Sequence, residues 1–226
     1  MVTAPVGPDA GGWFCPRWFE TTTPGYGTGV SLTRRALDRA ERMEGLDRPA
    51  DVVQRLADSV FPDTRGITTR LSGSRLGHPV HPALVAAPIG AWMSAGLLDL
   101  MPGHEDAARR LVLSGVVAAV PTAATGAVEF RKLRGEQRRI GVLHLLANVT
   151  ASTCYLTSYL QRRRGGTGRG AALLGLAAVS LGGLLGGHLT YALGAGVFRW
   201  RSDRAAPQPS PAPPGREPVA AGAREP

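Results

Sequence analysis

The sequence predicts an all-α integral membrane protein: an antiparallel four-helix transmembrane bundle preceded by short amphipathic helices, with disordered termini. Three observations lead to this prediction. Apolar residues gather into four runs between residues 83 and 193, the runs lack the polar stripes that a soluble bundle would show, and arginine clusters flank them. The overall hydrophobic content of 43% conceals this pattern because both ends of the chain are polar.

The segments outside the apolar runs divide into three parts. Residues 1–30 are rich in Gly, Pro and Thr without periodicity, and residues 199–226 are rich in Pro and Ala, so both are expected to be disordered. Residues 31–76 read as an amphipathic helical lead-in, with Ser31 as a helix cap and a second helix over 51–61 that ends at Pro62. Two placements stay open for this lead-in: packing on a neighbouring protein surface, or lying in the membrane interface.

The four runs define a transmembrane domain over residues 77–198. Each run is close to the roughly 20 residues that cross a hydrocarbon core. Pro88 and Pro121 fall inside runs, which a membrane helix tolerates better than a soluble one. The expected spans are Ala83–Met101, Leu111–Phe130, Ile140–Leu160 and Ala171–Leu193.

The charge distribution indicates where the chain resides. The formal charge of +9 comes largely from arginines beside the apolar runs, where they anchor helices to phospholipid headgroups, so no nucleic-acid partner is expected. No signal peptide is expected either, because a charged start followed by an apolar core is missing. The side on which the first span begins, with the loop 131–139, carries more cations. This excess predicts a multi-pass protein of the cell membrane with both termini in the cytoplasm.

Ionisable groups at membrane depth are candidates for function because burying them is costly. Antiparallel helices bring five such groups to the leaflet where the first span begins: His78, His81, Glu129, His144 and His188. His144 and His188 are expected at a matched depth of roughly 6–8 Å. They are therefore the predicted cofactor ligands, as axial ligands of a haem iron.

The remaining groups have supporting roles in this hypothesis. His78, His81 and Glu129 are candidate metal ligands, and Asn148 and Tyr191 can hydrogen-bond the ligands from one helical turn away. No residue is assigned a catalytic role. The structural alternative stays open, since interfacial histidines often bond backbone carbonyls or lipid headgroups.

Several spaced motifs resemble a known family. These are Gly77-His-Pro-Val-His-Pro82, Pro88-Ile-Gly-Ala-Trp92, Pro121-Thr-Ala-Ala-Thr-Gly126, Gly141-Val-Leu-His144 and Gly186-Gly-His-Leu-Thr-Tyr191. Over roughly residues 32–198 the chain resembles the uncharacterised membrane domain called domain of unknown function 2231. Some members carry a Rieske [2Fe–2S] domain after the last helix, which implies an electron-transfer setting. The tail here lacks Rieske ligands, and Glu129-Phe stands where relatives tend to have Asp followed by Trp.

The leading hypothesis is a redox or electron-transfer accessory subunit that binds haem b or a metal ion and has no catalytic activity of its own. Its partners would be the lipid bilayer, a separate Rieske-type or other redox protein, and further copies of the chain. The alternative is a non-enzymatic scaffold whose tails recruit cytoplasmic partners. A transporter has less support, because no polar track continues to the opposite leaflet.

Overall fold

The computed structural model describes residues 32–62, 66–73 and 77–197. Ser31 and the two terminal segments predicted to be disordered lie outside these residues. The chain divides into two units, residues 1–40 and 41–226, which are taken separately. Helix α1, Leu32–Glu41, occupies the described part of the first unit and ends at the boundary. Everything below concerns the second unit.

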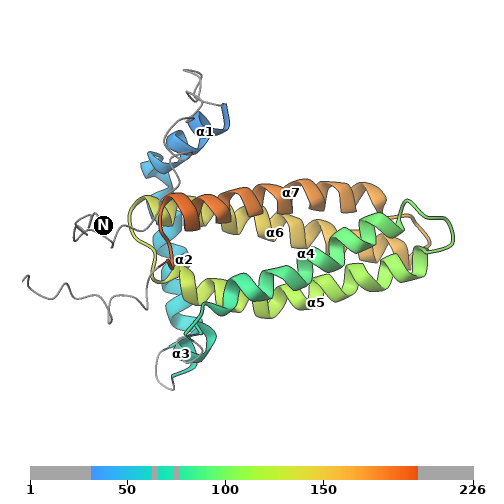
Figure 1. Ribbon diagram of the computed structural model, residues 1–226, viewed down its shortest axis with the longest axis horizontal. Coiled ribbons are helices and arrows are strands. Elements are labelled where there is room, and N and C mark those ends of the chain that lie inside the picture. The colour runs from blue at the N-terminus through green and yellow to red at the C-terminus, as the bar shows by residue number, and fades with distance from the viewer. Residues whose placement is uncertain (1–31, 63–65, 74–76, 198–226) are drawn as a thin grey trace, which may run out of the picture. The chain divides into compact units, whose positions relative to one another are not determined.

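Four long helices form an antiparallel bundle (Figure 1). They are α4 (Val80–Leu98), α5 (Glu105–Phe130), α6 (Glu136–Arg163) and α7 (Arg169–Gly187), and a π-helical turn over His188–Ala192 extends the last. Each is long and apolar enough to cross a membrane, which confirms the four predicted spans. Most begin or end a few residues beyond the apolar runs, because a helix continues through its polar ends into the headgroup region. Pro88 and Pro121 lie inside α4 and α5, as expected.

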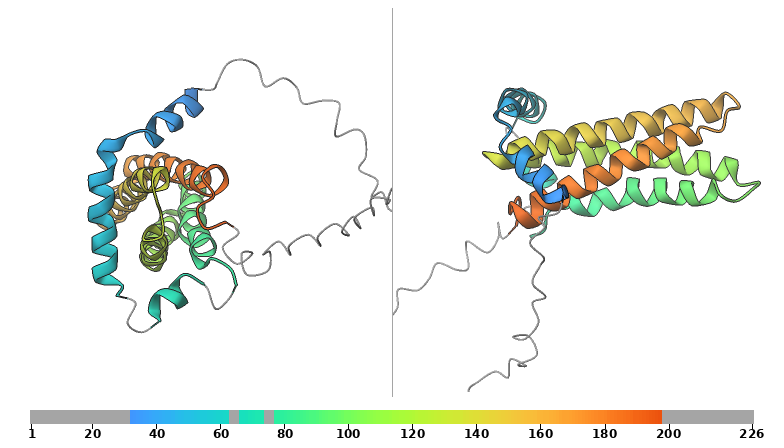
Figure 2. Two further views of the ribbon diagram at one scale, coloured as in Figure 1. Left: turned by 90° about the vertical axis from the view of Figure 1, so that its left-hand side faces the viewer. Right: turned by 90° about the horizontal axis from the view of Figure 1, so that it is seen from above.

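The helices pack as two hairpins, α4 with α5 and α6 with α7. Helices α4 and α6 lie diagonally across the bundle (Figure 2). At the centre the rings of Trp92 and Tyr155 stack with centroids 4.2 Å apart and planes 8° from parallel. Small residues pack around this pair, including Ala95 and Ala151. The core is therefore narrow, and most leucines face outward, as lipid contact requires.

The hairpins repeat one another in sequence spacing. Asp99 of α4 and Arg162 of α6 are 63 residues apart, and the same interval separates Trp92 from Tyr155 and His81 from His144. On the partner helices, Gly115 and Gly126 are eleven residues apart, as are Gly175 and Gly186. The repeat has equal helix directions in both copies. It is thus a parallel repeat about an axis along the bundle.

Helix α2 (Asp47–Val60) runs across one end of the bundle and follows a 3₁₀ turn at Glu44–Leu46. It starts four residues before the predicted helix and stops one residue before its predicted end. Buried Ala50 and Ala57 let α2 approach closely, and its acids pair with the bundle. The pairs are Asp47–Arg139 at 2.8 Å, Asp51–Arg138 at 2.6 Å and Asp58–Arg131. A short helix, α3 (Ile67–Leu71), then leads to α4.

Candidate functional site

His81 lies in the first turn of α4 and reaches across to α5. Its Nδ1 lies 3.0 Å from the backbone oxygen of Thr122 and 3.2 Å from the hydroxyl oxygen of Thr125. The imidazole rests on Gly126, where a Cβ atom would lie 2.9 Å from the ring carbon Cε1. A glycine is therefore needed at this position of α5 for the ring to fit.

His144 makes the equivalent contact from α6 to α7. Its Nδ1 lies 2.8 Å from the backbone oxygen of Gly182, and its ring rests on Gly186, where a Cβ would lie 3.0 Å from Cε1. The Asn148 amide donates to the His144 backbone oxygen at 2.7 Å, and its nitrogen also lies 3.3 Å from the ring Nε2. Asn148 is thus a hydrogen-bonding neighbour of His144, in the position assigned to it from sequence.

The two rings share one protonation pattern. A carbonyl oxygen can only accept, so Nδ1 of each neutral ring carries the proton and Nε2 keeps a lone pair. Backbone anchoring through Nδ1 is also how proteins orient histidines that ligate a metal through Nε2. His81 lies within electrostatic range of both His144 and Glu129. All three groups lie in the half of the bundle that is nearer α2.

The other predicted residues are placed differently. His188 opens the π-helical turn and bonds Glu41 through Nε2 at 2.6 Å, so its ring is engaged away from His144. His78 is exposed in the turn before α4, and Tyr191 is 90% exposed. Among the described residues no three His, Cys, Asp or Glu side chains gather closely enough to hold a metal ion. The matched imidazoles are His81 and His144.

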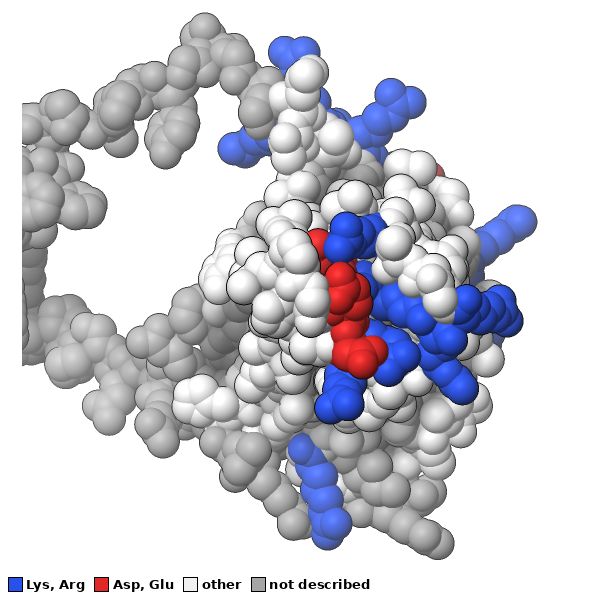
Figure 3. Space-filling model, turned by 90° about the vertical axis from the view of Figure 1, so that its right-hand side faces the viewer, with Lys and Arg blue, Asp and Glu red and all other residues white. Residues whose placement is uncertain are grey.

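A buried ion pair closes the opposite end of the bundle. Both Arg162 terminal nitrogens bond the Asp99 carboxylate, at 2.7 and 2.6 Å, and the two side chains are only 5% and 9% exposed. The partner of Asp99 is Arg162 on the diagonal helix, whereas Arg109, which is nearer in the sequence, pairs with Asp106 at 3.0 Å. On the surface of this end, cations lie beside a narrow band of acids (Figure 3).

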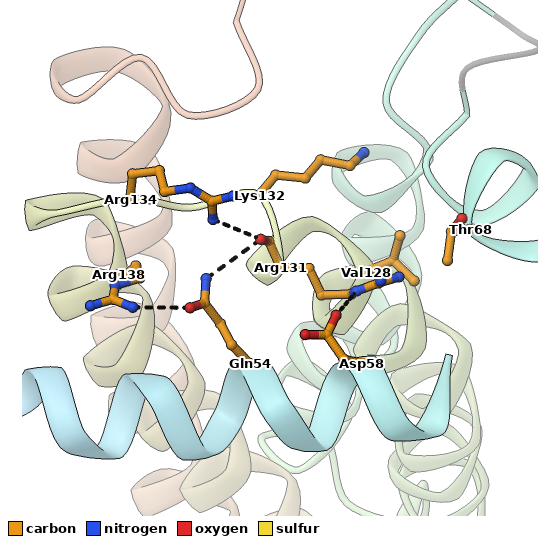
Figure 4. Close-up of a pocket in the computed structure, with 8 residues that line it drawn as sticks. All are labelled: Gln54, Asp58, Thr68, Val128, Arg131, Lys132, Arg134 and Arg138. Atoms are coloured by element: carbon orange, nitrogen blue, oxygen red, sulfur yellow. Dashed lines mark hydrogen bonds and ion pairs between the residues drawn. The ribbon is translucent and has the colours of Figure 1, made fainter. Parts of the chain in front are cut away.

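At the α2 end the surface contains a basic hollow of 710 Å³ between α2, α3 and the turn after α5. In Figure 4, Gln54 and Asp58 rise from α2 toward this turn, and Arg131 reaches down to Asp58. The hollow is lined by Gln54, Asp58, Thr68, Val128, Arg131, Lys132, Arg134 and Arg138.

Reasoning from single spans missed the residues on the bundle axis. Trp92 with Tyr155 and Asp99 with Arg162 each join equivalent positions of the two hairpins. The signal that would have found them is the 63-residue interval, which aligns a histidine, an aromatic ring and a charged residue in both copies. A search for internal repeats before assignment of the spans would have shown it.

Four spanning helices with a repeated polar core define this chain as a multi-pass membrane protein. The sequence profile of a family described as predicted membrane protein, domain of unknown function 2231, matches residues 77–199. The chain belongs to this family. No curated protein and no solved structure matches the chain.

Proposed function

We propose that this protein is a membrane-embedded redox accessory subunit that holds haem through the imidazoles of His81 and His144. The observation that supports it is their equivalence: each ring comes from the same position of a repeated hairpin, with Nδ1 fixed by a backbone oxygen. The Nε2 atoms of these two rings would hold the iron, and at His144 the Asn148 amide nitrogen, 3.3 Å from Nε2, would have to give way to it.

Haem is favoured over a bare metal ion by the number of ligands. A zinc or copper ion bound by protein alone commonly takes three or four side chains, and the described residues contain no such group. A porphyrin supplies four nitrogens itself and needs only two imidazoles. When bound, it would carry one electron at a time between the membrane and a separate redox protein, such as a Rieske-type partner.

His188 and His78 have no ligand role in this proposal. The bond from His188 to Glu41 ties the end of α7 to the segment before α2. Glu129 lies near His81 and pairs with Lys132 at 3.0 Å, which holds its charge at the rim of the site. Burial of the site near one end of the bundle limits electron transfer to partners on that side of the membrane.

The test is an absorption spectrum and metal analysis of the detergent-purified protein, expressed with haem supplied. We expect a Soret band that is lost in His81→Ala and in His144→Ala and kept in the exposed control His104→Ala. His188→Ala should keep the band, whereas its loss there with retention in His81→Ala would return the ligand pair to His144 and His188. A wild-type protein without a Soret band or stoichiometric metal would overturn the proposal and favour the scaffold role. Thermal unfolding of each variant separates loss of haem from loss of fold.

We further propose that the α2 end faces the cytoplasm. The turn between α5 and α6 and the first turn of α6 supply five cations at this boundary: Arg131, Lys132, Arg134, Arg138 and Arg139. With Cys15 and Cys154 replaced by serine, a cysteine introduced at Glu105 or at Gly166 should react only with a reagent added outside the cell. Labelling from the cytoplasm alone would reverse the orientation.

A further inference from the structure

The basic hollow beside α2 lies apart from the histidine pair, and its charge points to an anionic ligand. Four of the eight side chains that line it are cationic and one is a carboxylate. Asp58 already pairs with Arg131, and Arg138 holds Asp51 and Gln54. Within the described chain the Arg134 side chain bonds only backbone oxygens, at 2.9 and 3.0 Å, and has no carboxylate partner.

One buried atom of a residue that lines the hollow lacks a hydrogen bond. The Nε of Arg138 is buried and has no partner, although its terminal nitrogen Nη1 donates to α2. A guanidinium N–H without an acceptor is costly, and an oxygen of a bound anion would satisfy it if the side chain shifted toward the hollow. Lys132, which pairs with Glu129 at 3.0 Å, and Arg134 add two further cations to the lining (Figure 4).

The exposed side of α2 indicates at which level of the membrane the hollow lies. Val52, Leu56 and Val60 follow one another at intervals of four residues and are 46%, 59% and 66% exposed. They lie on the side of α2 away from Gln54 and Asp58, which bond the bundle. Helix α2 crosses the ends of the spans, and one of its sides is apolar and uncovered. Such a helix lies in the membrane interface and buries its apolar side at the boundary with the acyl chains. Its polar side is then level with the lipid phosphates.

We propose that this hollow binds the phosphate of an acidic phospholipid headgroup. Arginine forks match phosphate oxygens in pairs, and a lysine adds a compact charge. Basic pockets at the ends of membrane helices are suited to such headgroups. The exposed apolar line of α2 favours a lipid over a soluble phosphate as the source. The inference is independent of haem binding.

The experiment measures phosphatidylglycerol retained by the full chain in nanodiscs that contain phosphatidylcholine with increasing phosphatidylglycerol. We expect the wild type to enrich phosphatidylglycerol and the double variant Lys132→Gln with Arg134→Gln to lose roughly tenfold or more of this preference. The matched control, Arg163→Gln with Arg164→Gln, removes two cations from the opposite end and should keep it. Equal retention by the wild type and the hollow variant would overturn the proposal.

A second arm separates the two sources of phosphate. Inorganic phosphate and glycerol 3-phosphate are titrated into the protein in pure phosphatidylcholine, and thermal unfolding is followed. Stabilisation by phosphatidylglycerol but not by these soluble anions supports the proposal. Equal stabilisation by millimolar soluble phosphate would overturn the lipid assignment. Lys132→Gln alone removes one cation of the hollow together with its pair to Glu129, and it provides the same readout if the double variant does not fold.

Discussion

The two hairpins share a framework but fill it differently. In both, a histidine and an aromatic ring eleven residues later lie over glycines of the partner helix. In the first hairpin the aromatic residue also forms a hydrogen bond to the partner helix: the Trp92 indole N–H donates to the backbone oxygen of Val112 in α5, at 3.3 Å. The second has glycine at 182, where the first has Thr122, and fills the space with Asn148. Both hairpins therefore keep the glycines that contact these rings, here called the glycine beds (Gly115 and Gly126 in α5, Gly175 and Gly186 in α7), but the polar side chains beside them differ.

Positions on the axis between the hairpins divide into complementary and identical pairs. Tryptophan meets tyrosine, and aspartate meets arginine. Two identical charges at the positions of Asp99 and Arg162 would repel each other inside the bundle, so the two copies have opposite charges there. His81 and His144 are identical, although packing alone would accept two different residues. Two identical imidazoles at one level are consistent with the proposed shared ligand.

The largest effect should come from breaking the Asp99–Arg162 pair. Arg162→Met leaves a buried carboxylate with only the more distant Arg169, at 3.9 Å, and should lower the free energy of unfolding by about 3–5 kcal/mol. Because the two positions are equivalent, the exchange Asp99→Arg with Arg162→Asp should recover more than half of the loss. Denaturant unfolding in detergent measures both. An exchanged protein no more stable than Arg162→Met would contradict the equivalence of the hairpins.

The next effect concerns the glycine beds. Gly126→Ala and Gly186→Ala would place a Cβ about 3 Å from the His81 and His144 rings. Each should lower the free energy of unfolding by about 1–3 kcal/mol, because the ring must shift and its bond to the backbone oxygen weakens. Gly183→Ala is the control, since a Cβ there meets nothing within 4 Å. Sharply unequal losses would mean that one histidine alone is held in place.

A smaller effect is expected from exchanging the stacked rings. Trp92→Tyr with Tyr155→Trp keeps two aromatic faces on the axis but removes the indole bond to Val112. The net loss should be about 1 kcal/mol, the value of one hydrogen bond. Thermal unfolding and near-ultraviolet circular dichroism follow it. A loss as large as that from Trp92→Ala, about 3–5 kcal/mol, would show that each ring fits only its own hairpin.

The smallest effect concerns a feature that α6 does not share with α4: the first turn of α6 binds α2. The hydrogen bond from Arg139 lowers the pKa of Asp47 below its ordinary range. Its contribution to α2 docking is therefore complete above the ordinary aspartate pKa and is lost as pH falls through the lowered value. Hydrogen exchange of residues 47–60 should rise at that acid pH. In Asp47→Asn the exchange should already be raised at neutral pH and should lose this component of its pH dependence.

The sequence predicted those parts of the fold that depend on one segment at a time. Span number and direction follow from the length of apolar runs and from short loops, so all four were found. The partner of a side chain depends on how helices rotate against one another, which no single run encodes. This is why the pairing of Asp99 with Arg162, 63 residues further along the chain, was not predicted.

The candidate site shows the same division. The leaflet shared by His81, Glu129 and His144 could be read from position along each span. The pairing of His144 with His188 relied on depth alone, and the π-helical turn instead directs His188 to Glu41. The hollow beside α2 could not be predicted from the sequence either. It is formed by three segments and exists only once the acids of α2 pair with the arginines of the bundle.

The Asp99–Arg162 pair has a consequence for the order of biogenesis. During synthesis α4 emerges with its carboxylate long before the arginine that neutralises it, which follows 63 residues later. Until α6 has been made, this carboxylate lacks the arginine that covers it in the finished bundle. The first hairpin therefore cannot complete its polar end alone, and the buried pair forms only when the two hairpins pack together.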